Sequence, residues 1–119
     1  MTDFPITVFH NPACSTSRKT VALIEEAGYA PKVVEYLKAG WTAGQLRELF
    51  AAMGATAREA LREKGSPAAE LGLLEPGVGD EAIIAAMVAH PILVNRPIVS
   101  TPKGARLCRP VEVVHDVLP

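Results

Sequence analysis

The sequence predicts a mixed α/β fold built from a strand–helix–strand unit, a helical insert, and a closing strand–strand–helix unit. Three observations support this order. At the start, a β-branched segment is followed by a helical pattern. A long block without strand candidates comes next, and two short strands flank a Pro–Gly turn near the end. With 119 residues, 49% of them hydrophobic, the chain can build one core, so we expect one domain over residues 1–119.

Composition excludes several classes of protein. Twelve Lys and Arg against 13 Asp and Glu give a net charge of −1, which removes the broad positive field that unspecific nucleic-acid binders use. Two cysteines are too few for a disulfide scaffold. The sequence has no apolar run of about 18 residues, and the first five residues lack the basic and apolar character of a secretory signal. We therefore expect a cytoplasmic protein that binds neither nucleic acid nor membrane.

The first unit begins with a strand at residues 6–9, which an Asn-Pro turn ends. Apolar residues then recur at helical spacing over residues 17–27, and Gly28 follows as the expected stop. A second strand is predicted at residues 32–37. Because one helix separates the two strands, they are expected to lie parallel in a right-handed crossover.

The middle block, about residues 42–90, is predicted to be a helical insert. Thr42 with Gln45, and Thr56 with Glu59, have the spacing of a capping box. Helices are expected near residues 43–53, 57–64 and 67–71, and a further helix is expected to begin at a cap formed by Asp80.

The last unit contains strands at residues 98–100 and 105–108, which the turn at residues 101–104 joins into a hairpin. Pro110 then suits the first turn of a short closing helix. The Arg96–Pro97 bond is a candidate for the cis form, because a proline before a strand can close a thiol site from its other side.

Cys14 is the candidate reactive residue, because it lies between the first strand and the first helix. A thiol at a helix N-terminus faces free backbone N–H groups and the positive end of the helix dipole, and both favour the thiolate. His10, Ser17 and Arg18 are close enough in sequence to support the ionised sulfur. The alternative is a buried cysteine that acts as a small hydrophobic residue.

The other cysteine and two of the histidines are interpreted as structural or surface residues. Cys108 alternates with Leu107 on a predicted strand and is interpreted as structural. Ser17 stands three residues after Cys14, so a C-x-x-C couple is absent and electrons must come from an outside thiol. His90 is interpreted as a helix cap and His115 as a surface residue, and the spacing of His and Cys does not suggest a zinc site.

Three arginines are candidates for binding an oxyanion, whose geometry suits a guanidinium group. Arg96 and Arg109 each stand beside a proline at a strand end, where a loop would place them near the start of the first helix. From the pattern alone, Arg62 cannot be distinguished from Arg58, Arg47 or Arg106. For each single arginine, the alternative is a solvated surface position.

Three segments of the chain resemble the glutaredoxin-coupled arsenate reductase family. They are the loop His10-Asn11-Pro12-x-Cys14-x-x-Ser17-Arg18, residues 90–99, and the stretch Arg106-Leu107-Cys108-Arg109-Pro110. The resemblance covers nearly the whole chain in order, and it implies a thioredoxin-like fold with a helical insertion between the second and third strands. Two positions depart from the family: Ser15 replaces a glycine, and the chain ends before the charged tail of longer members.

The resemblance also implies a mechanism. Cys14 would attack arsenate to form a thiol–arsenate adduct, and Arg62, Arg96 and Arg109 would hold its oxygens. His10 and Ser17 match the positions that tune the thiol. Glutathione would serve as co-substrate and glutaredoxin as partner, with no bound cofactor or metal, and arsenite would be released.

Two other functions remain open on the same scaffold. One is a glutathione-dependent thiol/disulfide reductase, which the arginine trio argues against. The other is a redox-sensing regulator that binds RNA polymerase. Regulators of this kind typically carry a C-x-x-C switch, and Ser17 argues against it here. A structural or adaptor module is a third alternative, and it would leave the Cys14 loop without a role.

Overall fold

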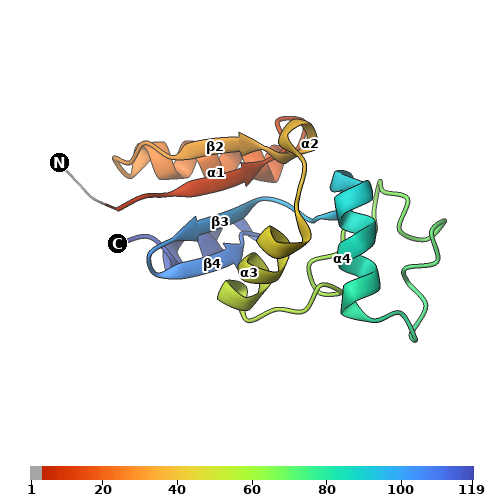
Figure 1. Ribbon diagram of the computed structural model, residues 1–119. Helices are drawn as coiled ribbons and strands as arrows, with labels where there is room; N and C mark the ends of the chain where they lie inside the picture. The colour runs from red at the N-terminus through yellow and green to blue at the C-terminus, as the bar shows by residue number, and fades with distance from the viewer. Residues whose placement is uncertain (1–3) are drawn as a thin grey trace. The chain divides into compact units, whose positions relative to one another are not determined.

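The computed structural model describes residues 4–119 (Figure 1) and divides the chain into two compact units. One unit combines the chain up to Ala39 with Arg96–Pro119, and the other is Gly40–Asn95. The predicted helical insert of residues 42–90 lies inside the second unit, while the expectation of one domain stays a prediction. Residues 1–3, part of the segment that lacks the character of a secretory signal, lie outside the described residues.

The first unit contains a four-stranded sheet in the order β2-β1-β3-β4. The strands are β1 (Thr7–His10), β2 (Lys32–Glu35), β3 (Ile98–Thr101) and β4 (Gly104–Leu107). β1 runs parallel to β2, and β3 is antiparallel to both β1 and β4. The predicted parallel crossover and the predicted hairpin are therefore both confirmed.

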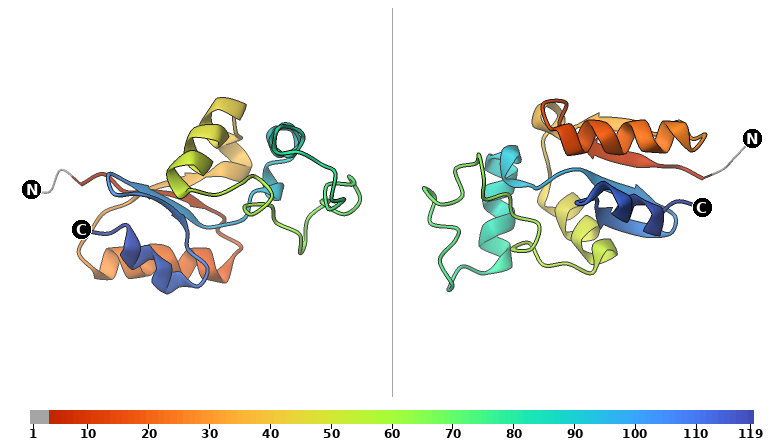
Figure 2. Two further views of the ribbon diagram at one scale, coloured as in Figure 1. Left: turned by 90° about the horizontal axis from the view of Figure 1, so that it is seen from below. Right: turned by 180° about the vertical axis from the view of Figure 1, so that it is seen from behind.

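Two helices, α1 (Ser15–Glu26) and η2 (Val111–Asp116), cover the same face of this sheet (Figure 2). η2 is a 3₁₀ helix that begins after Pro110. Between the helices and the strands lies an apolar core of Ile6, Val8, Ile24, Val99, Cys108, Val114, Val117 and Leu118. The aliphatic residues that alternate along the predicted strands supply much of this core, because successive strand side chains point to opposite faces.

The end of α1 has the form that its glycine predicts. Gly28 has a φ of +96° and donates its N–H to the Glu25 carbonyl, while the N–H of Tyr29 bonds to the Ile24 carbonyl. This pair of bonds is a Schellman motif, which uses the left-handed conformation that glycine adopts without steric cost.

The second strand is shorter than predicted. It ends at Glu35, and Tyr36–Ala39 form the single helical turn α2 instead of continuing the strand. Tyr36 is buried with only 1% of its surface exposed, while the following residues up to Ala39 are exposed. Burial of this one aromatic side chain outweighs the local strand pattern, because β propensity depends on context.

The second unit contains the helices α3 (Ala43–Met53) and α4 (Asp80–Ala89) and the 3₁₀ turn η1 (Pro91–Leu93). Thr42 caps α3 by accepting the Gln45 N–H at 3.1 Å, as the sequence predicts. The predicted cap at Asp80 is wrong by one residue. Gly79 is the N-cap of α4, and Asp80 is the first helical residue. Its carboxylate instead accepts the Ala57 N–H at 3.3 Å.

The predicted helices at residues 57–64 and 67–71 are wrong, because this part of the chain forms turns (Figure 1). The Thr56–Glu59 capping box does form, with reciprocal bonds of 2.8 and 3.1 Å. The helix then fails because Leu61 forms an antiparallel bridge with Val94. The adjoining backbone groups bond across this bridge instead of along a helix, since Arg62 N–H donates to Leu93 and Asn95 N–H donates to Ala60.

Arg58 stabilises the turns at residues 73–78, which follow the second predicted helix. Its guanidinium donates to the carbonyl oxygens of Leu73, Glu75 and Val78 at 3.4, 2.9 and 2.8 Å. One cation thereby satisfies three backbone carbonyls in a segment without regular secondary structure. Within residues 4–119, none of the helices has the length and apolar character needed to cross a membrane.

Candidate active site

Cys14 is the N-cap of α1, with extended φ and ψ of −95° and 122°. Its N–H donates to the Asn11 carbonyl at 3.0 Å, and its own carbonyl accepts the Arg18 N–H at 3.0 Å. The first bond closes a tight turn with Pro12 at its second position, and the second bond begins the helix. Helix geometry then leaves the N–H groups of Ser15–Ser17 without intrahelical partners beside the sulfur.

Arg109 and Arg96 both reach the sulfur of Cys14. Arg109 Nη1 donates to Cys14 Sγ at 3.6 Å and to the Arg96 carbonyl at 3.0 Å. The Arg96 side chain also hydrogen-bonds the sulfur. Each arginine precedes a cis proline, so the Arg96–Pro97 bond has the form proposed for it from the sequence. The structure thus brings two of the three candidate arginines to one thiol.

The surroundings lower the pKa of Cys14 to about 7, below its ordinary value. Partial burial is the largest influence and raises the pKa, because it removes the thiolate from water. The Ser17 backbone N–H, the hydrogen bonds from Arg96 and Arg109, and the charge of Arg96 together outweigh burial. About half of the thiol is therefore ionised near neutral pH.

His10 and Ser17 form a hydrogen-bonded pair next to this turn. His10 Nδ1 lies 2.6 Å from Ser17 Oγ, and the Asn11 N–H donates to the same oxygen at 3.1 Å. The Ser17 hydroxyl is therefore engaged by His10 and Asn11, while its backbone N–H acts on the sulfur. Burial lowers the pKa of His10, Glu35 opposes that effect, and Arg18 adds to it.

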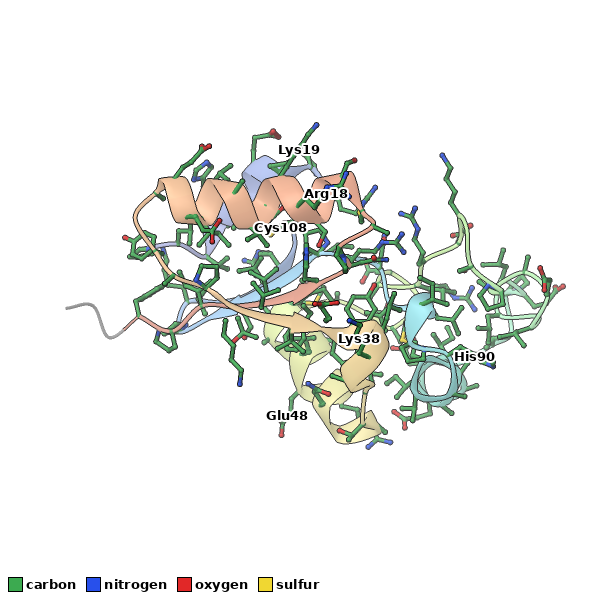
Figure 3. The ribbon with its side chains drawn as sticks, turned by 90° about the horizontal axis from the view of Figure 1, so that it is seen from above. Arg18, Lys19, Lys38, Glu48, His90 and Cys108 are labelled. Atoms are coloured by element: carbon green, nitrogen blue, oxygen red, sulfur yellow. The ribbon has the colours of Figure 1, made fainter. Side chains whose placement is uncertain are left out.

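Arg18 and Asn11 hold the turn itself. Arg18 Nη1 donates to the Pro12 carbonyl at 2.8 Å from the exposed side of α1 (Figure 3). Asn11 Oδ1 accepts the Ala13 N–H at 2.9 Å, and Asn11 is buried. From the sequence pattern, the Asn-Pro pair predicts only a turn. The signal that could have singled out Asn11 is the capacity of an asparagine side chain to bond the backbone two residues ahead.

Arg62 lies in the second unit, where its side chain contacts Lys64 and Asn95. Its Nε donates to the Lys64 carbonyl at 2.8 Å and its Nη1 to Asn95 Oδ1 at 3.3 Å. Its role as a third oxyanion ligand stays a prediction. Arg47 differs from it, because this exposed arginine pairs with Glu81 at 2.6 Å.

Cys108 has the structural character that the sequence indicates. It is completely buried, and burial raises its pKa to about 12, with Asp116 adding to the rise and Arg106 opposing it. Both cysteines are free thiols. Figure 3 marks Cys108 close to α1 and His90 on the second unit, where His90 is the exposed C-cap of α4.

His115 is exposed on η2, as the sequence indicates for a surface residue. Within residues 4–119, the structure contains no group of three or more His, Cys, Asp or Glu side chains arranged to hold a metal ion.

Comparison with known proteins identifies the family. The sequence profile of the ArsC family matches residues 9–117, which include the Cys14 turn and both arginines that reach it. The chain belongs to the ArsC family. The arsenate reductase ArsI1 of Synechocystis is 62% identical to this ArsC chain over 118 residues, which are 99% of the chain and 82% of that protein. The arsenate reductase of Escherichia coli K12 is 49% identical over 114 residues, covering 96% and 81%.

A solved structure agrees with this ArsC assignment. The arsenate reductase of Vibrio cholerae superposes with a TM-score of 0.93 at 38% identity and covers 98% of this chain and 100% of its own. The thioredoxin-like α/β fold that the resemblance implies is therefore confirmed, as is the resemblance itself.

Proposed function

We propose that this protein reduces arsenate to arsenite through an adduct on Cys14. The observation that carries the proposal is a half-buried thiol with a pKa of about 7 and hydrogen bonds from two guanidinium groups. A thiolate is the nucleophilic form of cysteine, and guanidinium groups match the oxygens of a tetrahedral oxyanion. The arsenate reductase names of the relatives from Synechocystis and Escherichia coli support the same substrate.

The first step needs positive charge, because arsenate and thiolate repel each other. Arg96, Arg109 and the N–H groups at the start of α1 supply that charge, and Arg62 is proposed as a further ligand. The Cys14 sulfur attacks arsenic, a sulfur–arsenic bond forms, and one arsenic–oxygen bond breaks. The leaving oxygen departs as water after protonation, and arsenic remains in the +5 state.

The next steps deliver two electrons from outside thiols. Glutathione condenses on the bound arsenic and releases a second water. A glutaredoxin thiolate then attacks the glutathione sulfur, forms a mixed disulfide, and leaves the electron pair of the sulfur–arsenic bond on arsenic, which becomes As(III). Water releases arsenite and regenerates Cys14. When a second glutathione reduces glutaredoxin, one arsenate and two glutathione molecules give arsenite, glutathione disulfide and water.

Two observations support an outside reductant. Position 17, where a C-x-x-C couple would have its second thiol, is a serine whose hydroxyl bonds to His10 and Asn11. Cys108 is fully buried, and its raised pKa keeps it protonated near neutral pH. A free and partly ionised thiol also suits a reducing compartment, so we place the reaction in the cytoplasm.

The test is oxidation of NADPH in a coupled assay with glutathione, glutaredoxin and glutathione reductase. Arsenate is compared with a hydroxyethyl disulfide as the substrate, and glutaredoxin is omitted in a parallel reaction. We expect arsenate-dependent turnover that requires both thiols. Turnover of the disulfide with none of arsenate would replace the proposal with a glutathione-dependent disulfide reductase.

A further inference from the structure

We infer that Asn11 is a positioning residue that holds Cys14 where its thiolate is stabilised. The inference deepens the proposed function and rests on it for the reaction that the thiolate performs. It concerns the ionisation of Cys14, which can be measured without arsenate.

Within the described residues, Asn11 makes three hydrogen bonds to residues 13–17. Its Oδ1 accepts the Ala13 N–H at 2.9 Å, and its carbonyl accepts the Cys14 N–H at 3.0 Å. Its N–H donates to Ser17 Oγ at 3.1 Å. One residue thus connects the turn before the thiol, the thiol residue and the first turn of α1.

The side chain of Asn11 is the protected part of this arrangement. Only 3% of the Asn11 surface is exposed, whereas Arg18, which holds the Pro12 carbonyl of the same turn, is exposed. A hydrogen bond shielded from water constrains geometry more strongly than one that water can replace. The Asn11–Ala13 bond has a buried acceptor and an exposed donor residue, so it is more protected than the exposed Arg18–Pro12 bond and is the better candidate for fixing the direction of the chain into Cys14.

The position of the sulfur matters because the groups that lower its pKa act at short range. These groups are the Ser17 N–H and the side chains of Arg96 and Arg109, the last at 3.6 Å. If the turn loosens, the sulfur keeps its partial burial, which raises the pKa, and loses part of the opposing stabilisation. The pKa of Cys14 then rises.

Loss of the Asn11 side chain need not unfold the protein. Ala13 is exposed, so water can satisfy its N–H in an Asn11→Ala variant, and the main-chain bonds of residue 11 remain possible. Asn11→Ser keeps a neutral, weaker acceptor and serves as the conservative variant. Thr20→Val is the matched control, because Thr20 is also buried and its hydroxyl bonds the Thr16 carbonyl at 2.9 Å within α1 instead of a residue of the turn at 11–14.

The experiment measures the rate of Cys14 alkylation by iodoacetamide from pH 5.5 to 10, with the label assigned by mass spectrometry. If Asn11→Ala raises the pKa from about 7 to about 8, the ionised fraction at pH 7 falls from about one half to about one eleventh, so alkylation slows about fivefold. At pH 10 the two rates should agree within about twofold, because the thiol is ionised in both proteins. Asn11→Ser should fall between them, and Thr20→Val should keep the wild-type pH profile.

An unchanged Cys14 pH profile in Asn11→Ala would overturn the inference. So would an equal shift in Thr20→Val, because Asn11 would then act only through general stability. Arsenate turnover is measured on the same proteins. A shifted profile in a protein that shows no arsenate turnover would leave the role of Asn11 intact and refute the proposed function alone.

Discussion

Arg109 has two tasks in the proposed reaction, and replacing it by alanine separates them. Its Nη1 lies 3.6 Å from the Cys14 sulfur, so it stabilises the thiolate before arsenate binds. A hydrogen bond to a charged group contributes about 1.5–3 kcal/mol when shielded, and exposed ion pairs contribute about 1 kcal/mol or less. Because Arg109 is exposed, we take about 1 kcal/mol, which corresponds to about 0.7 of a pKa unit.

The two measurements should therefore fall by different amounts in Arg109→Ala. A rise of about 0.7 in the Cys14 pKa lowers the thiolate fraction at pH 7 from about one half to about one sixth, so alkylation slows about threefold. Arsenate turnover loses that threefold factor and also a donor to the charge that develops on the oxygens, which is worth about a hundredfold, so kcat/KM should fall about three hundredfold.

Alkylation is followed with iodoacetamide and turnover in the coupled NADPH assay. Arg47→Ala is the matched control, because it removes an exposed arginine whose partner is Glu81. Equal losses in the two assays would refute the oxyanion role of Arg109, since only the thiol would then depend on it. Unchanged arsenate turnover would refute both roles.

The other predictions concern the thiols and the His10–Ser17 pair. Cys14→Ser should abolish arsenate turnover, and a loss of less than tenfold, about 1.4 kcal/mol of barrier, would rule out the nucleophile. Alkylation of Cys14 should rise through pH 7 and level off above pH 8, because the thiolate is the reactive form and the pKa is about 7; a midpoint near pH 9 would contradict the charge arrangement. Cys108→Ser should lower the free energy of unfolding by about 1–3 kcal/mol in urea titrations, since it places a hydroxyl in an apolar core, and leave the Cys14 pH profile unchanged. Ser17→Ala removes the partner of His10 Nδ1, so the His10 pKa measured by NMR should change. An unchanged titration would show that the 2.6 Å contact does not stabilise either protonation state of His10.

The pKa values of the two thiols have opposite consequences for stability at alkaline pH. The Cys14 pKa is lowered, so its thiolate contributes stability that is present above pH 9 and is lost as the pH falls through about 7. The Cys108 pKa is raised to about 12, so the unfolded chain ionises this thiol first and the protein loses stability as the pH rises above about 9. The free energy of unfolding of Cys14→Ser and Cys108→Ala, measured from about pH 7 to above pH 9, should separate the two effects. Cys14→Ser should lack the gain in stability between about pH 7 and 9, and Cys108→Ala should lack the loss above about pH 9.

The parts of the fold that were predictable from the sequence depend on residues that constrain their own neighbours. Gly28 has the left-handed φ that ends α1, and Thr42 accepts the N–H that begins α3. Turn residues likewise bring β3 and β4 together as a hairpin. The failed helices at residues 57–64 and 67–71 show the limit of such signals. The capping box of the first of these forms, but backbone groups at residues 60–62 bond to Leu93 and Asn95, more than 30 positions along the chain.

The candidate site divides in the same way. The sequence by itself determined that Cys14 stands at a helix start with no second thiol three residues on, because helix ends and turns follow from local residue types. Only the tertiary structure decided that Arg109, 95 positions away, donates to its sulfur. That contact depends on how β3 and β4 pair beside β1, and long-range pairing is a property of the whole core rather than of any short segment.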